Sequence, residues 1–155
     1  MKILMVCLGN ICRSPLAQGI LTEKALQAGL PWIVESAGTE GYHVGEAPHQ
    51  LSQQVAKENG IDISMQRCRQ FSPEDMRFYD KIYAMDQSNY NDIKRLCGKN
   101  WQEEKVKLIL NELNPGKNED VPDPWYGGIE GFRDVFEMLD KACEKIIEPH
   151  QFHSS

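Results

Sequence analysis

The chain has 155 residues, of which 41% are hydrophobic and 26% are charged, a composition typical of a soluble globular protein and not of a disordered or fibrous chain. A chain of this length can bury one core, so we expect a single domain over residues 1–155. No apolar run approaches the roughly 18–20 residues that span a bilayer, and we expect no membrane association. The net charge of −6 disfavours nucleic acid as a partner, because the phosphate backbone attracts basic surfaces.

The cysteines indicate a reducing compartment. The chain has an odd, scattered set of five and no export signal, which predicts reduced thiols and a cytoplasmic location: Cys7, Cys12, Cys68, Cys97 and Cys143. Their spacing does not match a zinc site, so we expect no metal and no cofactor.

Short apolar runs alternate with helical periods along the chain. Strands are predicted at residues 2–7, 32–37, 80–86 and 105–110. Helices are predicted at five places: from a cap at Ser14 to a stop at Gly29, over about Pro48 to Asn59, beginning at Ser72, over about Gln87 to Cys97, and over about 129–147. A loop is predicted at 114–128. The alternation predicts an α/β three-layer sandwich, with a four-stranded parallel sheet and helices on both faces. Ligands of such sheets bind beyond the carboxyl ends of the strands.

The segment between the first strand and the first helix has the residues of an anion receptor. Its sequence is CLGNICRS, from Cys7 to Ser14. Gly9 and Asn10 are residue types that accept positive φ, so the loop can curl around an anion. Backbone N–H groups at a helix N-terminus attract negative charge, and the planar guanidinium of Arg13 can hold two phosphoryl oxygens.

Cys7 lies at the base of this predicted receptor. A cysteine facing helix N–H groups and an arginine is expected to ionise readily to the thiolate, which is a nucleophile. Ser14 could donate a hydrogen bond to it. A cysteine at a strand end can also be simply a small apolar residue, but a Cys–Arg pair separated by five residues across a strand-to-helix turn is difficult to explain by packing. The segment therefore predicts phosphoryl transfer to Cys7.

A late aspartate is the candidate for proton transfer. Asp123 stands between two prolines in VPDPWY, which stiffen the chain around the carboxyl group. One carboxyl group could protonate the leaving group and later deprotonate water. Asp-Pro is also a common turn pair, so the residues alone leave this role open. Trp125 and Tyr126 follow directly and could form a wall for an aromatic substrate or simply pack.

The segment CLGNICRSP resembles the signature of the low-molecular-weight protein tyrosine phosphatases. The resemblance extends to SAGT at Ser36–Thr39, MDQSN at Met85–Asn89 and DPWYGG at Asp123–Gly128. It implies hydrolysis of phosphotyrosine and aryl phosphate monoesters through a phosphocysteine intermediate, with acid-phosphatase activity. It also implies that Cys7 is the nucleophile, that Arg13 binds phosphate and that Asp123 is the general acid and base.

The same resemblance implies roles for other residues. Those expected to bind substrate are Leu8, Gly9, Asn10, Ile11, Cys12, Ser14, Tyr42, Trp125 and Tyr126, and those expected to support the loop are Ser36, Arg69 and Asp86. Gln66 stands where the family has a histidine, and the four histidines of this chain are interpreted as surface residues. A reversible Cys7–Cys12 disulfide is implied too, although Cys12 could equally only pack.

The resemblance leads us to expect phosphotyrosine proteins or small aryl phosphates as partners, with phosphate, sulfate or vanadate as active-site anions, and a monomer or weak dimer. Two alternatives stay open. An arsenate reductase on the same fold would need two further cysteines close in sequence, but Cys68 and Cys97 are 29 positions apart. A phosphocarrier that stores a phosphocysteine would not need Arg13 together with Asp123.

Overall fold

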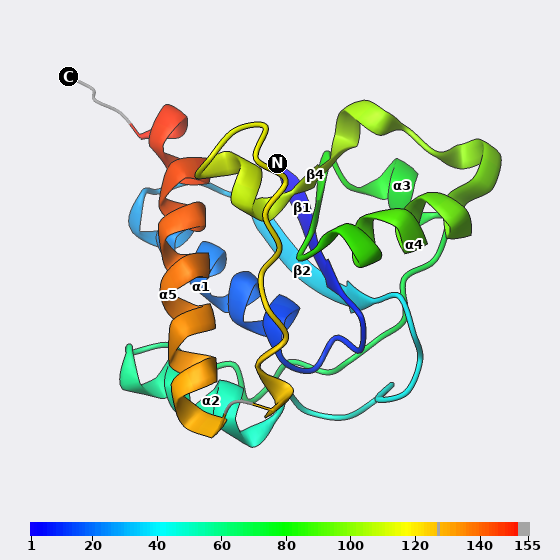
Figure 1. Cartoon of the computed structure of the whole chain (residues 1–155). Coiled ribbons are helices and arrows are strands. Elements are labelled where there is room, and N and C mark those ends of the chain that lie inside the picture. Colours follow the sequence, from blue (N-terminus) through cyan, green and yellow to red (C-terminus); the bar gives the residue numbers. More distant parts are fainter. Residues whose placement is uncertain (127, 152–155) are drawn as a thin grey trace.

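The computed structural model of the protein describes residues 1–126 and 128–151, with the backbone alone at Tyr126. Its centre is a four-stranded sheet in which all neighbours are parallel and the order is β2-β1-β3-β4 (Figure 1). The strands are β1 (Lys2–Cys7), β2 (Ile33–Gly38), β3 (Lys81–Ala84) and β4 (Val106–Leu108). All four carboxyl ends therefore lie at one edge of the sheet.

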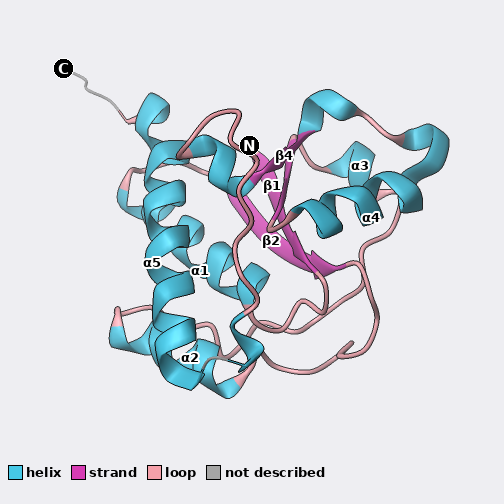
Figure 2. Ribbon diagram, viewed as in Figure 1, coloured by secondary structure: helices cyan, strands magenta, loops and turns pink. Residues whose placement is uncertain are grey.

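Helices cover both faces of this sheet (Figure 2). One face carries α1 (Arg13–Gln27), α2 (Gln50–Glu58) and α5 (Gly128–Ile147), and the other carries α3 (Asp75–Phe78) and α4 (Gln87–Cys97). The predicted three-layer α/β sandwich is confirmed.

Strand β1 connects the two layers of the core. Ile3 and Met5 face the cluster formed with α1 and α5, whereas Leu4 and Val6 face the cluster formed with α3 and α4. All four side chains are fully buried. A strand buried on both faces reads as a continuous apolar run, which is why KILMVC was recognisable in the sequence.

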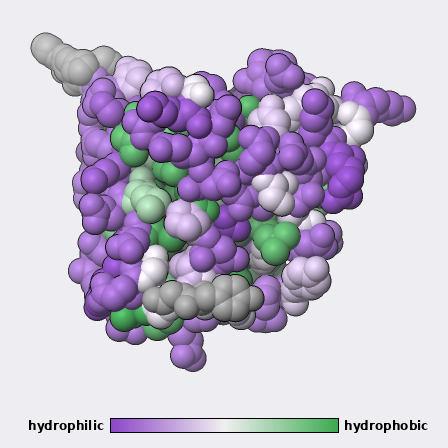
Figure 3. Space-filling model, viewed as in Figure 1, coloured by the Kyte–Doolittle hydropathy of each residue, from purple (hydrophilic) through white to green (hydrophobic). Residues whose placement is uncertain are grey.

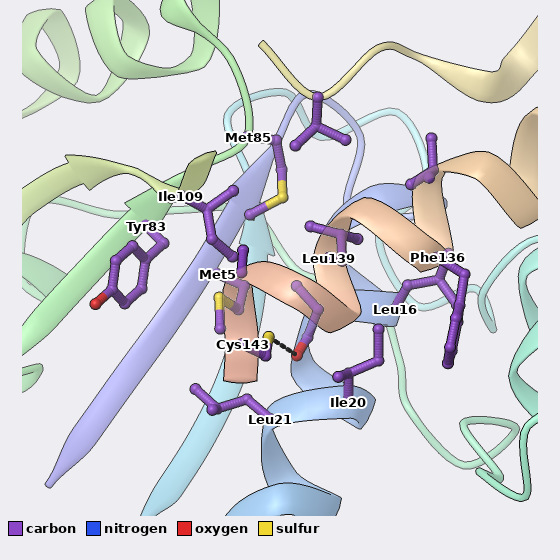
Figure 4. Close-up of a cluster of buried hydrophobic side chains, with 14 of the residues drawn as sticks. Met5, Leu16, Ile20, Leu21, Tyr83, Met85, Ile109, Phe136, Leu139 and Cys143 are labelled. Carbon is purple, nitrogen blue, oxygen red and sulfur yellow. Dashed lines mark hydrogen bonds between the residues drawn. The ribbon is translucent and has the colours of Figure 1, made fainter. Parts of the chain in front are cut away.

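The larger cluster forms where α5 packs on α1 and the sheet. Figure 4 shows Leu139 and Cys143 of α5 near Leu16 and Ile20 of α1, with Met5 of β1 to their left, next to Cys143. The apolar period of α5 is long and regular, so its stripe of side chains stays in contact with this layer over the whole helix. The packing holds the start of α1, which follows Cys7, against the sheet.

Some element boundaries differ from the prediction. Helix α1 begins at Arg13 with Cys12 in the cap position, and Ser14 lies inside the first turn. The prediction that Ser14 caps this helix is wrong, because its hydroxyl group is engaged with Cys7 and Asn10. The predicted loop at 114–128 contains a short 3-10 turn at Pro124–Tyr126.

The surface is mainly hydrophilic on the face shown in Figure 3, with apolar side chains scattered among polar ones. Within residues 1–126 and 128–151, none of the helices combines the length and the apolar character needed to cross a bilayer.

We predict that Leu139→Ala lowers the free energy of unfolding by about 2–5 kcal/mol, because it leaves a cavity in the fully buried contact between α5 and α1. Urea denaturation followed by far-UV circular dichroism measures this change. The matched control is Leu26→Ala on α1, where the side chain is 71% exposed and the expected change is within about 0.5 kcal/mol. Equal effects of the two substitutions would contradict this packing.

Candidate active site

A cavity of about 200 Å³ opens at the carboxyl edge of the sheet. This volume is below the roughly 300–1,000 Å³ of sites for drug-sized ligands, so the cavity suits a group the size of one side chain. It is lined by Cys7, Leu8, Gly9, Ile11, Cys12, Arg13, Tyr42, His43, Asp123 and Trp125. The cavity thus brings together the three predicted catalytic residues, although Cys7 and Asp123 are separated by most of the chain.

Cys7 ends β1 at the floor of the cavity, and its side chain is nearly fully buried. Its Sγ lies 3.0 Å from Oγ of Ser14. Ser14 Oγ already accepts a hydrogen bond of 2.9 Å from Nδ2 of Asn10. Its own hydrogen is therefore free to be donated to the sulfur, which is the arrangement that stabilises a thiolate.

Asn10 fixes the conformation of the loop that follows Cys7. Its φ is 57°, a left-handed conformation that asparagine tolerates better than most residues. Nδ2 donates to Ser14 and, at 2.9 Å, to Oγ of Ser36, while Oδ1 accepts from the Arg69 N–H at 2.9 Å. Both donors and the acceptor of this buried amide are thus satisfied, and the loop is held to the strand ends around it.

Two further residues support the loop and were missed in the sequence. A Cβ at Gly38 would lie 2.8 Å from the Leu8 carbonyl oxygen and 2.9 Å from the Asn10 nitrogen, so only glycine allows β2 to approach so closely. Gln18 of α1 accepts a 2.6 Å hydrogen bond from the Ser36 hydroxyl. Gly38 belongs to the SAGT motif, which was the signal available for it.

Arg13 lies at the rim with its guanidinium already oriented. Nη1 donates to Oδ2 of Asp86 at 2.7 Å and to the Val121 carbonyl at 2.9 Å. Within the described residues, Nε and Nη2 have no protein hydrogen bond and so can bind an oxyanion. Burial opposes the charged form, but the nearby Cys7 sulfur and Asp86 raise the pKa of Arg13 above its ordinary value.

The segment that carries Asp123 is attached to the end of β3. The Val121 N–H donates to the Met85 carbonyl at 2.8 Å, and Asp120 Oδ1 accepts from the Gln87 N–H at 2.9 Å. Asp123 itself is exposed and lines the cavity, with Oδ1 accepting from the Trp125 N–H at 3.0 Å. Its carboxyl group can therefore meet a ligand that enters from solvent.

The wall of the cavity is aromatic and apolar. Leu8, Tyr42 and Trp125 are exposed around its mouth. The strand-like course of the chain continues after β2, where the Thr39 N–H donates to the Cys7 carbonyl and the Glu40 N–H to that of Leu8. This pairing carries Tyr42 to the cavity. The side chain of Tyr126, predicted for the same wall, lies outside the described part of the structure.

Other predicted residues lie behind the cavity. The side chains of Asn10 and Ser14, expected to bind substrate, are buried and do not line it. Arg69 pairs with Asp75 through bonds of 3.0 and 3.1 Å while its backbone holds Asn10. Gln66, in place of the family's histidine, donates to the Pro15 carbonyl at 3.2 Å.

Two histidines make contacts that the sequence interpretation did not include. His43 and His49 are half-buried beside Trp125, and His43 lines the cavity. Both histidines are partly exposed, as expected of surface residues, but the interpretation missed that they pack on Trp125. Nothing in their sequence spacing points to Trp125, because the contact joins segments more than 70 positions apart.

Two neighbouring thiols are held in the neutral form. Burial raises the pKa of Cys12 to about 12, and the negative charges of Cys7 and Asp123 contribute further. Burial also raises the pKa of Cys68 to about 11, again with a contribution from Cys7. The Cys68 thiol donates to the Asn10 carbonyl at 2.7 Å. At neutral pH both of these thiols are therefore uncharged.

The fold and the cavity define a class: an α/β protein in which a cysteine at a strand end and an arginine at the following helix start line one cavity. Residues 2–153 match the family described as low molecular weight phosphotyrosine protein phosphatase. The chain belongs to this family, and it is a protein-tyrosine phosphatase. The family assignment disfavours the two alternative functions considered from the sequence, an arsenate reductase and a phosphocarrier.

Individual relatives match over nearly the whole chain. A putative low molecular weight protein-tyrosine-phosphatase of Synechocystis is 42% identical, over 95% of this chain and 94% of its own. The low molecular weight protein-tyrosine-phosphatase YfkJ of Bacillus subtilis is 36% identical over 94% and 93%. Its crystal structure superposes with a TM-score of 0.88 at 33% identity over 98% and 97% of the two chains. A Drosophila arginine phosphatase has a TM-score of 0.88 at 29% identity over 99% and 100%.

We predict that Cys12 resists alkylation by iodoacetamide in the folded protein at neutral pH, because only a thiolate reacts readily and its pKa is raised to about 12. Labelling should increase only as the pH approaches that value, and tandem mass spectrometry distinguishes Cys12 from Cys7. In Cys7→Ser the burial remains but the neighbouring charge is lost, so labelling should begin at lower pH. Rapid labelling of Cys12 at pH 7, at the rate seen in urea, would contradict this assignment.

Proposed function

We propose that the cavity hydrolyses phosphotyrosine and aryl phosphate monoesters, with Cys7 as nucleophile, Arg13 as phosphate ligand and Asp123 as general acid and base. The observation that carries the proposal is the position of the Cys7 sulfur, 3.0 Å from the Ser14 hydroxyl at the floor of a cavity that Arg13 and Asp123 also line. The six loop residues from Leu8 to Arg13 would surround the phosphoryl group with backbone N–H donors.

In the first step, the Cys7 thiolate attacks phosphorus. An S–P bond forms as the P–O bond to the phenol breaks, and the carboxyl group of Asp123 donates its proton to the departing oxygen. The charge on the three remaining oxygens is stabilised by Arg13 and the loop amides, which are oriented before the reaction and need not reorganise. The anchoring of Nη1 by Asp86 and Val121 keeps the guanidinium in this orientation.

In the second step, a water molecule attacks the phosphocysteine. The Asp123 carboxylate accepts a proton from the water as the new P–O bond forms and the S–P bond breaks. Inorganic phosphate leaves, and Cys7 returns to the thiolate. Asp123 is again protonated, so the cycle is balanced without a metal or cofactor.

The shape of the site supports an aryl substrate. Tyr42 and Trp125 are exposed and line the cavity, so their rings can contact a phenyl ring that enters it. Phosphotyrosine proteins and small aryl phosphates fit this wall, and phosphate, sulfate and vanadate are the anions expected to compete. Since one structural relative is named an arginine phosphatase, phosphoarginine peptides are the substrate to compare with phosphotyrosine and phosphoserine peptides.

Regulation, location and assembly stay predictions. All five cysteines are unpaired, which supports a reducing compartment such as the cytoplasm. A reversible Cys7–Cys12 disulfide would protect the nucleophile from irreversible oxidation, and its formation would be slowed by the neutral state of the Cys12 thiol. A monomer or weak dimer is proposed for the assembly.

We predict that Cys7→Ser lowers turnover of a phosphotyrosine peptide by about four orders of magnitude or more, as loss of a nucleophile does in other enzymes, while the unfolding transition is retained. Phosphate release with a chelator present measures the rate. The matched control is Cys97→Ser on α4, on the opposite side of the sheet, which should retain activity. Unchanged hydrolysis by Cys7→Ser would end the proposal.

We predict that Asp123→Asn lowers kcat/KM for a phosphotyrosine peptide by about 10²–10⁴-fold, the usual contribution of a general acid. The loss should be much smaller for p-nitrophenyl phosphate, whose leaving group needs less protonation. The inhibition constant of phosphate should not rise, because the carboxylate is not a phosphate ligand. Equal losses on both substrates would contradict the role of Asp123 as the acid.

A further inference from the structure

His49 joins the segment after β2 to the phosphate loop. It occupies the cap position of α2, and its backbone N–H donates to the Ile11 carbonyl at 2.9 Å. Ile11 lines the cavity, whereas His49 does not. The backbone of His49 is therefore fixed relative to the loop that would hold the phosphoryl group.

The side chain of His49 is held in one orientation. Its Nδ1 accepts a hydrogen bond of 3.0 Å from the Leu51 N–H, which caps α2. A nitrogen that accepts this bond carries no proton, so the ring is neutral with its hydrogen on Nε2. Burial lowers the pKa of His49, and the neighbouring His43 contributes. The ring plane is thus set by the helix cap.

The oriented ring lies between α5 and the segment of Asp123. It stacks on Phe132 of α5, with centroids 5.0 Å apart and planes at 28°. It meets Trp125 in a T-shaped contact, with centroids 5.3 Å apart and planes at 71°. Such aromatic pairs are favourable beyond the area they bury. Trp125 is 47% exposed, and among the described side chains its ring also meets His43, with centroids 6.3 Å apart and planes at 36°. The His49 ring is the nearer of these two contacts.

Trp125 in turn orients Asp123. The backbone N–H of Trp125 donates to Asp123 Oδ1 at 3.0 Å, and Pro124 between them has a restricted φ. Asp123 is exposed and lies outside the regular helices and strands. The Trp125 ring acts on Asp123 through the Trp125 backbone: a shift of the ring that carries this backbone with it would move the carboxyl group, and a misplacement of 1 Å can lower a rate by about 10²-fold.

We propose that His49 is a positioning residue, whose ring holds Trp125, and through it the carboxyl group of Asp123, at a set place above the phosphate loop that its backbone also binds. The proposal rests on the function of Asp123 proposed above. His49 touches neither the substrate nor the reacting atoms. It couples the acid to the phosphate site through one side chain and one backbone bond.

Two substitutions separate the ring of His49 from its cap. His49→Asn keeps a strong helix cap, since asparagine is among the best residues at that position, but it removes the aromatic contact with Trp125. His49→Phe keeps an aromatic ring on Phe132 and Trp125 but removes the acceptor for the Leu51 N–H. A merely structural role would make stability and activity change together in both variants.

The test measures kcat/KM for a phosphotyrosine peptide and for p-nitrophenyl phosphate, together with the Tm. For His49→Asn we expect a loss of about tenfold on the peptide, within the range that misplacement causes, and little loss on p-nitrophenyl phosphate. Its Tm should fall by about 2–4 °C because the aromatic contacts are lost, so the two variants are matched in stability and differ in activity. For His49→Phe we expect a rate on the peptide rescued toward that of the natural protein, and a Tm about 2–4 °C lower from the lost cap.

The double variant His49→Asn/Asp123→Asn completes a double-mutant cycle, in which kcat/KM for the peptide is compared among the four proteins. If His49 acts through Asp123, the double variant should be no slower on the peptide than Asp123→Asn alone. Additive losses, equal losses of His49→Asn on both substrates, or no loss on the peptide would overturn the positioning role while leaving the function of Asp123 standing. An Asp123→Asn variant without leaving-group dependence would overturn both proposals.

Discussion

The side-chain amide of Asn10 makes hydrogen bonds to three segments from a position that is 1% exposed. Leaving one such buried group unpaired would cost about 1–3 kcal/mol, so Ser14, Ser36 and the Arg69 backbone are constrained to one arrangement. The same bonds hold Asn10 at positive φ and leave the Ser14 hydrogen free to be donated to the Cys7 sulfur, 3.0 Å away. The loop from Leu8 to Arg13 and the proposed nucleophile Cys7 thus depend on a polar network that does not line the cavity.

A second constraint connects this loop to the candidate acid. Arg13 Nη1 binds both Asp86, which caps α4, and the Val121 carbonyl, two residues before Asp123. The buried guanidinium needs these acceptors, because an unpaired charge away from water is costly. Satisfying Arg13 therefore brings the β3–α4 junction and the acid segment to the end of β1. The contact of His49 with Trp125, and its backbone bond to Ile11, form a second connection between the loop and the same segment.

The alternation of strands and helices was predictable because each element has its own pattern of apolar residues along the sequence. KILMVC reads as a doubly buried strand, and the stripe of α5 reads as a helix packed on one side. Local signals failed where a tertiary partner competed for the same group. Ser14 has the identity of a helix cap, yet Cys7 and Asn10 engage its hydroxyl group. Gly38 has no local reason to be glycine, and only the approach of the Leu8–Asn10 backbone explains it.

The sequence by itself determined which reactive side chains are present: a cysteine and an arginine at a strand-to-helix turn, and an aspartate between prolines far along the chain. It also determined the alternation from which a parallel sheet follows, because periodicity is a local property. The tertiary structure alone decided which distant groups meet. The place of Asp123 above Cys7, the anchoring of Arg13 and the contact of His49 with Trp125 all join segments remote in sequence. Their meeting depends on packing across the whole domain, which no local pattern encodes.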